Sequence, residues 1–386
     1  MSTLSLNWQD LSRDKFLAEY WQKKPVLLRQ AVSSFAPPIS VDEVAGLALE
    51  DEIESRIIWQ QHPETGKPWV LEHGPFAEKT LQQLPEHGWS LLVQGVDQWL
   101  PEVATLLEYF TFLPQWRFED IMISIAPGGA SVGPHVDQYD VFLCQIEGQR
   151  HWHWSLNCDQ GLTYRTDTPL NILSQPLPDP TSSALLEPGD VLYLPPGIAH
   201  HGIAQSLSQT WSVGFRAPDI EEIFTALGQR IAIESDAETL RYTDPDITIA
   251  EGGRNGLNAL SLQRLRQLIE RCLNRPEVVA DVMGALVTRQ SMHQVQWQSI
   301  DDNTPPLDHD LVSWALGTRK TYFETRFYVN GASYEIPEAD KALIKRLMSL
   351  EKMVWQDLYG SANTTEGRTI LLRLWNLQLL VPSLEP

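Results

Sequence analysis

The sequence is poor in cysteine and in basic residues. Three cysteines among 386 residues, none in a C-x-x-C arrangement, argue against a disulfide framework and against a cysteine-based zinc site. Lys and Arg number 29 against 50 Asp and Glu, which gives a formal charge of −21. Because nucleic-acid affinity depends on basic side chains that neutralise phosphates, this charge argues against direct nucleic-acid binding and favours a basic protein partner.

Long apolar runs are absent as well. The N-terminal stretch MSTLSLNWQDLSRDKFLAEYW is charged by residue 10 and has no apolar core of signal-peptide length. No uninterrupted apolar run approaches the length needed to cross a bilayer. We therefore expect a cytoplasmic protein without a membrane segment.

The chain has enough apolar material for large cores, since 42% of its residues are hydrophobic. Its length predicts two or three domains. Short alternating or continuously apolar segments with Gly and Pro turns run from residue 116 to 218, and this texture predicts a mainly β domain of the jelly-roll type.

The pattern changes after Pro218. Asp219 and Glu222 form a capping-box pattern at the start of a striped helix, and two more amphipathic helices follow before residue 300. Residues 301–310 have the composition of a linker. Beyond them, Asn330-Gly331 predicts a hairpin turn, and RTILLRLWNLQLLV near the C-terminus is interpreted as a strand. We expect domains at 1–218, 219–300 and 301–386.

The segment GPHVDQYDVF, residues 133–142, places His135 and Asp137 two positions apart before an apolar strand. On an extended chain such residues share a face and can converge on one ion. Two imidazoles and a carboxylate on one face of an octahedron are typical of non-haem Fe(II) oxygenases. The alternative is an ordinary turn pair, with Asp137 bonded to nearby backbone, and spacing alone favours it.

A second histidine in a suitable place favours the metal site. EPGDVLYLPPGIAHHGIA runs from an acidic turn through a strand and a Pro-Pro-Gly corner to His200 and His201. Adjacent strand residues face opposite ways, so only one of the two can reach the ion. We assign His200, the first histidine after the corner, as the metal ligand, and place His201 beside the site or at the surface.

The segment GQRHWHW supplies a candidate anchor for an acidic co-substrate. If iron uses 2-oxoglutarate to activate dioxygen, the distal carboxylate of that acid needs a buried cation, and Arg150 can hold it in bidentate fashion. Arg150, Trp152 and Trp154 share one face of the strand, whereas His151 and His153 share the other. We interpret the two histidines as ordinary strand residues. A surface cation at a turn is the alternative for Arg150.

Ser124, in the segment IMISIA, could add a hydroxyl to the same carboxylate. A buried serine that bonds to backbone is an equally good interpretation of this residue.

Together, GPHVDQYDVF, GQRHW, LPPGIAHHG and SVGFRAP resemble the JmjC-type 2-oxoglutarate oxygenases, whose fold is the cupin-like double-stranded β-helix. More narrowly, they resemble the bacterial ribosomal oxygenases that hydroxylate an arginine of a large-subunit ribosomal protein. YWQKKPVLLRQA near the N-terminus resembles the entry segment of the same group. The likeness covers residues 15–218 in its motifs and the rest of the chain in its organisation.

The resemblance implies His135, Asp137 and His200 as Fe(II) ligands, and Arg150 and Ser124 as the 2-oxoglutarate site. It further implies a helical dimerisation region at 219–300, a winged-helix-like α+β domain at 301–386, and a homodimer. The implied activity is that of a dioxygenase of the protein arginine 3-hydroxylase type, with O2 as the second co-substrate and a basic ribosomal protein as partner.

Three alternatives remain at this stage. The first is the same chemistry on a different residue, such as a histidine, of another protein. The second is a metal-binding cupin that does not use 2-oxoglutarate. The third is a non-catalytic protein that binds a partner through its C-terminal domain.

Overall fold

The structure is a computed structural model that describes residues 5–37, 39–157, 161–233, 241–245, 257–289 and 304–383. The chain forms two compact units that divide between Ala217 and Pro218. The domain boundary expected at residues 300 and 301 lies outside the described residues, so the division into three domains stays a prediction. Within the described ranges, no helix combines the length and the apolar character that crossing a membrane requires.

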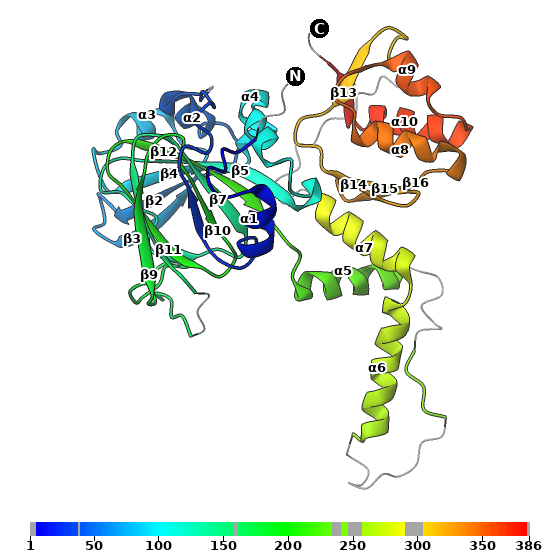
Figure 1. The fold of residues 1–386 in the computed structure, drawn as a ribbon, viewed down its shortest axis with the longest axis horizontal. Helices are drawn as coiled ribbons and strands as arrows, with labels where there is room; N and C mark the ends of the chain where they lie inside the picture. Colours follow the sequence, from blue (N-terminus) through cyan, green and yellow to red (C-terminus); the bar gives the residue numbers. More distant parts are fainter. Residues whose placement is uncertain are drawn as a thin grey trace. The chain divides into compact units, whose positions relative to one another are not determined.

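In the described residues, the first unit contains an eight-stranded antiparallel sheet (Figure 1). Its strands, in spatial order, are β1 (Val26–Leu28), β10 (Val191–Leu194), β7 (Asp140–Glu147), β12 (Ser208–Phe215), β5 (Phe118–Ala126), β4 (Trp89–Val93), β2 (Ser55–Gln61) and β3 (Pro68–His73). The crossovers between strands distant in sequence are those of a jelly roll.

A smaller antiparallel sheet faces part of the large one. In the described residues it consists of four strands, in the order β6 (His135–Val136), β11 (Ala199–Ala204), β8 (Arg150–Ser155) and β9 (Thr181–Leu186). This pair of sheets confirms the predicted cupin-like β domain.

The sequence of strand β7 is continuously apolar because both faces of the strand are buried. Val141 and Leu143 pack between the two sheets, together with Trp152 and Trp154 of β8. Phe142, on the opposite face of β7, belongs to a larger core on the outer side of the large sheet. A strand that is buried on both faces cannot alternate between apolar and polar residues.

The outer core is covered by the N-terminal helices. These are α1 (Arg13–Glu19), α2 (Val41–Leu47), α3 (Glu78–Gln82) and α4 (Pro101–Ala104), with short 3-10 turns at Val96–Gln98, Thr105–Phe110 and Gln115–Arg117. Phe16 of α1 contacts Phe142 of β7 at a ring-centroid distance of 5.8 Å and Tyr193 of β10 at 5.0 Å. The N-terminal segment is therefore part of the β domain's core.

In the part of the second unit that the structure describes, the first helices are α5 (Ile220–Ile233), α6 (Ala259–Leu273) and α7 (Pro276–Thr288). The predicted capping box at the start of α5 is confirmed, because Asp219 and Glu222 each accept a backbone hydrogen bond from the other, at 2.8 and 3.0 Å. Asp281 of α7 accepts hydrogen bonds from Arg230 of α5 and from Arg326 and Tyr328 of the hairpin that follows.

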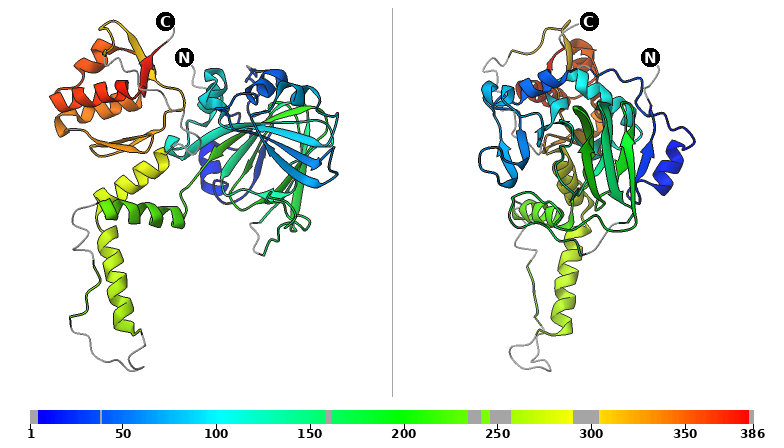
Figure 2. Two further views of the ribbon diagram at one scale, coloured as in Figure 1. Left: turned by 180° about the vertical axis from the view of Figure 1, so that it is seen from behind. Right: turned by 90° about the vertical axis from the view of Figure 1, so that its left-hand side faces the viewer.

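The remainder of the second unit mixes strands and helices. The strands are β13 (Leu311–Trp314), β14 (Lys320–Phe323), β15 (Arg326–Val329), β16 (Ala332–Glu335), β17 (Met353–Val354) and β18 (Leu380–Pro382); the helices are α8 (Lys341–Met348), α9 (Trp355–Gly360) and α10 (Thr365–Asn376). Asn330 and Gly331 form the predicted turn between β15 and β16, both with positive φ. In Figure 2, α8 and α10 lie side by side.

The strand predicted over residues 368–381 is wrong in its larger part. Most of this segment is helix α10, and only Leu380–Pro382 is a strand. Thr364 directly precedes the helix and caps it, because its side chain accepts a hydrogen bond from the Gly367 amide. Leu371 and Leu374, three residues apart, supply the buried face, so the helical period outweighs the local run of apolar residues.

Candidate metal centre

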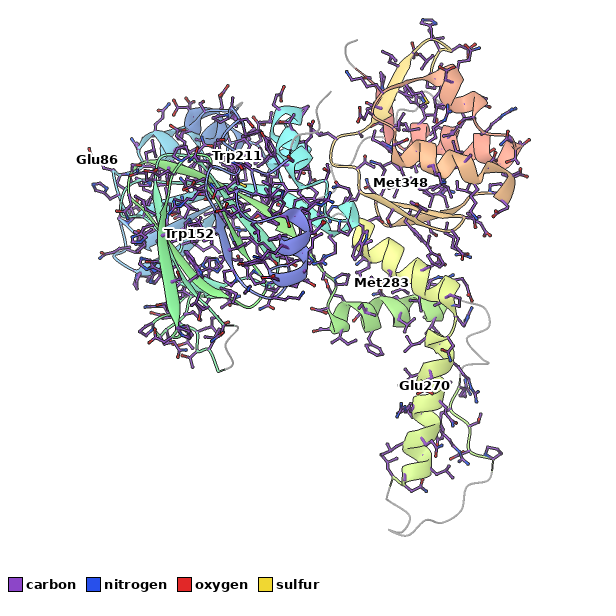
Figure 3. All side chains as sticks on the ribbon, in the orientation of Figure 1. Glu86, Trp152, Trp211, Glu270, Met283 and Met348 are labelled. Carbon is purple, nitrogen blue, oxygen red and sulfur yellow. The ribbon has the colours of Figure 1, made fainter. Side chains whose placement is uncertain are left out.

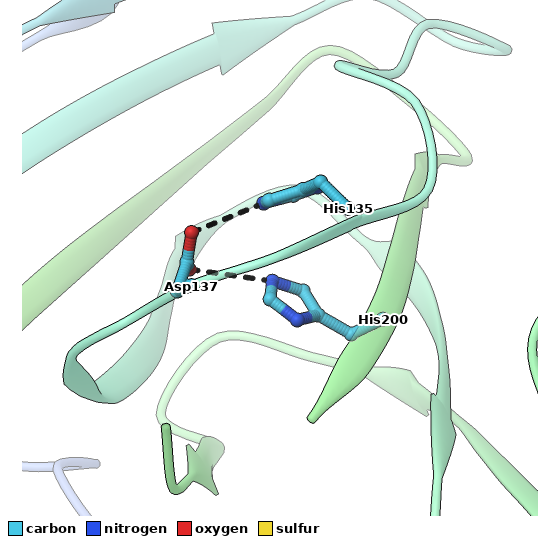
Figure 4. A group of neighbouring side chains, drawn as sticks. All are labelled: His135, Asp137 and His200. Atoms are coloured by element: carbon cyan, nitrogen blue, oxygen red, sulfur yellow. Dashed lines mark ion pairs between the residues drawn. The ribbon is translucent and has the colours of Figure 1, made fainter. Parts of the chain in front are cut away.

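His135, Asp137 and His200 converge at one end of the small sheet (Figure 4). Nε2 of His135 lies 3.7 Å from Oδ1 of Asp137, and Nε2 of His200 lies 3.5 Å from Oδ2. The ligand atoms of all three side chains lie within 4.8 Å of one another. This is the spacing that one shared ion requires, and it brings together the three predicted ligands.

Strand pairing sets this arrangement. His200 of β11 pairs directly with His135 of β6, and the two imidazole rings are 4.2 Å apart between centroids. Asp137 follows β6 and lies on the same side as His135, as the spacing of two residues predicts.

A hydrogen bond at Nδ1 fixes the orientation of the imidazole ring in both His135 and His200. Nδ1 of His135 lies 2.9 Å from the carbonyl oxygen of Gly133, and Nδ1 of His200 lies 2.9 Å from that of Ile198. A backbone carbonyl only accepts, so each Nδ1 carries the proton and donates it. Each Nε2 is thereby left with a lone pair that points toward Asp137, which is how metal-binding histidines are held in proteins.

His200 is fully buried, and its burial and the neighbouring His135 lower its pKa to about 4. The ring is therefore neutral near pH 7, the form that can bind a metal. Its neighbour His201 faces the opposite side of β11, where it pairs with His153 of β8. Of the two adjacent histidines, the structure brings only His200 to the group with Asp137.

The donor set fits a divalent iron ion. Two imidazole nitrogens and one carboxylate are the donors of the facial triad that leaves other coordination positions open in non-haem Fe(II) oxygenases. The structure contains no cysteine sulfur in this group, whose members are the two histidines and Asp137.

A cavity of about 370 Å³ extends from this group into the space between the sheets. Arg150, Ser124 and Trp152 line it together with the three candidate ligands. Its other walls come from several strands and from the loop before β9, and include Arg56, Ile58, Leu71, His73, Leu92, Met122, Val132, Val136, Leu143, Pro169, Leu170, Asn171, Ile172 and Ser212. The volume suits a small organic acid together with one inserted side chain.

Arg150 is 6% exposed and lies inside this space without an acidic neighbour among the described residues. Its Nη1 donates to Ser124 Oγ at 3.0 Å and its Nη2 to Ser208 Oγ at 3.2 Å, whereas its buried Nε has no partner. Burial lowers the pKa of the guanidinium to about 10, so it stays charged near neutral pH. A buried cation held only by hydroxyl groups is a site for an anion.

Strand β8 turns the predicted set of residues toward the interior. Arg150, Trp152 and Trp154 are buried, whereas His151 and His153 are only half-buried on the other face. Trp152, labelled in Figure 3, lies 5.8 Å from the His200 ring between centroids. The Arg150 guanidinium lies 5.9 Å from the centre of the same ring, so the indole lines the cavity beside both groups.

Sequence reasoning missed Ser208 and the walls from β2 and β3. Ser208 begins β12 and shares one face of this strand with Thr210 and Ser212, a polar face that could have indicated a lined cavity. Arg56 and His73 lie more than sixty residues before His135, and no local pattern connects them to it.

A jelly roll that holds two histidines and an aspartate around one point is typical of metal-dependent oxygenases. The family model described as "JmjC domain" matches residues 105–223. Together with the relatives below, this shows that the chain belongs to the JmjC-domain ribosomal oxygenases.

The chain is 36% identical over 347 residues to the Escherichia coli (strain K12) ribosomal protein uL16 3-hydroxylase. The alignment covers 86% of this chain and 87% of the relative. A probable ribosomal oxygenase of Haemophilus influenzae is 29% identical over 93% of this chain and 91% of its own length. The solved structure of the Escherichia coli ribosomal oxygenase YcfD with cobalt and 2-oxoglutarate superposes with a TM-score of 0.76, at 30% identity, over 98% of this chain and 99% of that one.

Proposed function

We propose that this protein is an Fe(II)- and 2-oxoglutarate-dependent hydroxylase that modifies an arginine of a large-subunit ribosomal protein. The observation that carries the proposal is the cavity that contains both the His135–Asp137–His200 group and the acid-free guanidinium of Arg150. The Escherichia coli relative named a ribosomal protein uL16 3-hydroxylase, and the YcfD complex with cobalt and 2-oxoglutarate, support it.

His135, Asp137 and His200 would hold the iron through two Nε2 atoms and one carboxylate oxygen. When bound, Fe(II) would supply the activation of dioxygen that C–H hydroxylation requires, with 2-oxoglutarate converted to succinate and carbon dioxide. The carbonyls of Gly133 and Ile198 keep the two imidazoles in the tautomer and orientation that this role needs.

Arg150 holds the distal carboxylate of the co-substrate. Its two Nη groups are already oriented by Ser124 and Ser208, and its unpartnered Nε is a further donor. Because the guanidinium is rigid and planar, it fixes the direction of the acid as well as its position. The apolar wall of Leu143 and Trp152 excludes water and strengthens these charged contacts.

The formal charge of −21 supports a basic protein substrate. Long-range attraction raises the encounter rate with a ribosomal protein segment rich in Lys and Arg, and it weakens as salt screens it. Such a substrate also places the enzyme with ribosomes in the cytoplasm.

We further propose a homodimer. Helix α6 exposes an apolar stripe whose members are Leu262, Leu265, Ile269 and Leu273, each between 39% and 55% exposed. None of the α6 residues, all of which the structure describes, is buried. A second copy of the chain would cover this stripe, so replacing Leu265 with Glu should shift the mass measured by light scattering toward that of a monomer.

The decisive experiment measures co-substrate turnover and the protein product together. The purified chain, given Fe(II) and 2-oxoglutarate, should form succinate faster when ribosomal proteins from a strain lacking the enzyme are added. Mass spectrometry should then find one +16 Da mark on an arginine of one large-subunit protein. An Asp137→Ala variant, which lacks the carboxylate of the candidate metal site, is the control.

Succinate formation that does not depend on iron would contradict the proposed chemistry. Unmodified ribosomal proteins, in the presence of iron-dependent turnover, would contradict the proposed substrate only. The two parts of the proposal are therefore tested separately.

A further inference from the structure

The outer face of the small sheet carries three histidines that the proposed reaction does not use. His151 and His153 are two positions apart on β8 and point away from the cavity, with ring centroids 4.4 Å apart. His201 projects from the same outer face of the neighbouring strand β11. All three side chains are half-buried, and so remain accessible to an ion from solution.

Strand register brings the third imidazole to the other two. His201 pairs directly with His153 across the antiparallel ladder, and directly opposed residues have Cβ atoms about 4.5–5.5 Å apart. The residues in register with these histidines from the flanking strands are Ser183, Leu185 and Ile203. None of these is acidic, so no residue in register with the three imidazoles on the described strands offers a carboxylate to pair with them.

We propose that His151, His153 and His201 form a second metal site, which binds a divalent d-block cation such as Zn²⁺. Imidazole nitrogen is the preferred ligand of Zn²⁺, Cu²⁺ and Ni²⁺, and three imidazoles with one water complete a tetrahedral zinc site. A pair at positions i and i+2 of one strand and a directly opposed residue of the next strand supply the three donors on one face.

The site differs from the catalytic group in how it is assembled. Among the described residues, the one group whose three ligand atoms already lie within 4.8 Å is that of His135, Asp137 and His200. The outer histidines close on the ion by rotation of their side chains, which their partial exposure permits. The bound ion would join β8 to β11, the two strands that carry Arg150 and His200 on their inner face.

Equilibrium dialysis against Zn²⁺, with metal content measured per chain, tests this site. The protein is the full chain without a purification tag, in an Asp137→Ala/His200→Ala background that removes the catalytic group. This background should bind one zinc ion per chain. Adding His151→Gln and His153→Gln should raise the Kd by more than about tenfold, since even an outer partner of a ligand contributes that much. His309→Gln, at an exposed position of the second unit, is the matched control and should bind normally.

Thermal unfolding of the same variants separates metal loss from misfolding. Without metal, the His151→Gln/His153→Gln protein should melt at the temperature of its parent. Saturating Zn²⁺ should raise the melting temperature of the parent only. A background variant that binds no zinc would overturn the proposal, as would zinc binding that survives replacement of His151 and His153. Unchanged affinity in a single His201→Gln variant would overturn the three-imidazole site.

Discussion

Arg150 Nη1 donates a 3.0 Å hydrogen bond to Ser124 Oγ, across the space between the two sheets. Arg150 belongs to β8 of the small sheet and Ser124 to β5 of the large one. Ser124 Oγ in turn donates to the backbone carbonyl of Thr210 at 3.2 Å, so it satisfies the backbone and supports the guanidinium at once. The serine therefore bonds to backbone, as one of the two sequence interpretations expected, whereas its contact with the co-substrate stays a prediction.

Replacing Arg150 with Met should separate function from stability. The variant lacks the charged group that we propose as the partner of the co-substrate carboxylate. Such a hydrogen bond is worth about 1.5–3 kcal/mol, or roughly 10- to 150-fold in Kd for 2-oxoglutarate. Its free energy of unfolding should not fall, because a buried guanidinium without an acidic partner is replaced by an apolar chain of similar length. Calorimetric binding and urea denaturation measure the two effects, and unchanged affinity would show that the anchor lies elsewhere.

Ser208→Ala tests the second support of the guanidinium. Losing the 3.2 Å bond from Arg150 Nη2 should raise the KM for 2-oxoglutarate about fivefold, the equivalent of about 1 kcal/mol, with little change in kcat. Ser90→Ala is a matched control, because Ser90 is equally buried but its hydroxyl has no partner. Similar KM values for the two variants would remove Ser208 from the site.

His200→Ala and His201→Ala should differ in iron binding although the residues are adjacent. The first removes a nitrogen that points toward Asp137, whereas the second removes a ring on the opposite face of β11. Under anaerobic conditions, the visible absorption of the Fe(II)–2-oxoglutarate complex should disappear in His200→Ala and persist in His201→Ala. Equal loss in both variants would contradict the assignment of His200 alone.

Gly202→Ala should disturb the cavity from the adjacent strand. An added Cβ would lie 2.8 Å from two ring carbons of Trp152, which is closer than such atoms pack. We expect a destabilisation of about 1–3 kcal/mol, seen in thermal unfolding, and weaker binding of 2-oxoglutarate. Gly46→Ala is the control: it lies in helix α2 with no atom within 4 Å of the added Cβ, and should stabilise the protein slightly.

Asp281→Asn should make the second unit less stable in a pH-dependent way. Burial acts to raise the pKa of Asp281, but hydrogen bonds from Arg326, Arg230 and Tyr328 outweigh it, so the pKa lies below its ordinary value. A depressed pKa gives stability that is present above about pH 4, the unfolded pKa, and is lost as pH falls through the lower folded value.

Calorimetry should therefore show a deficit of about 1–3 kcal/mol in the free energy of unfolding of Asp281→Asn. The expected deficit is no larger because solvent screens both arginines, which are partly exposed. The deficit should be constant between pH 5 and 7, by the same linkage, and shrink below about pH 4. The exposed Asp308→Asn is the control and should show no such deficit.

Much of the site could be predicted because strand periodicity decides which side chains share a face. His135 and Asp137, and the buried row of Arg150 and Trp152, follow from a period of two within single strands. Ser208 could not be assigned in this way, because its contact with Arg150 depends on how the two sheets pack. The same limit applies to Arg56, which reaches the cavity from β2 through a pairing order that no local pattern specifies.

The helical error in the second unit has a different origin. The segment around Leu371 contains apolar residues at both strand and helix periods, and the burial of Leu371 and Leu374 in the core of the second unit determines which period is used. Such long-range contacts override local preference. The capping threonine upstream, Thr364, was the local signal for a helix.

Strand β7 belongs to two cores at once, one that lines the cavity and one that packs against α1. Phe16 contacts Phe142 on one face of the strand, while Val141 and Leu143 contact the tryptophans of β8 on the other. Folding of the catalytic sheets and docking of the N-terminal helix are thereby thermodynamically linked. A truncation that removes α1 should unfold the oxygenase domain cooperatively, and hydrogen exchange should give the same free energy of opening for the amides of β8 and α1.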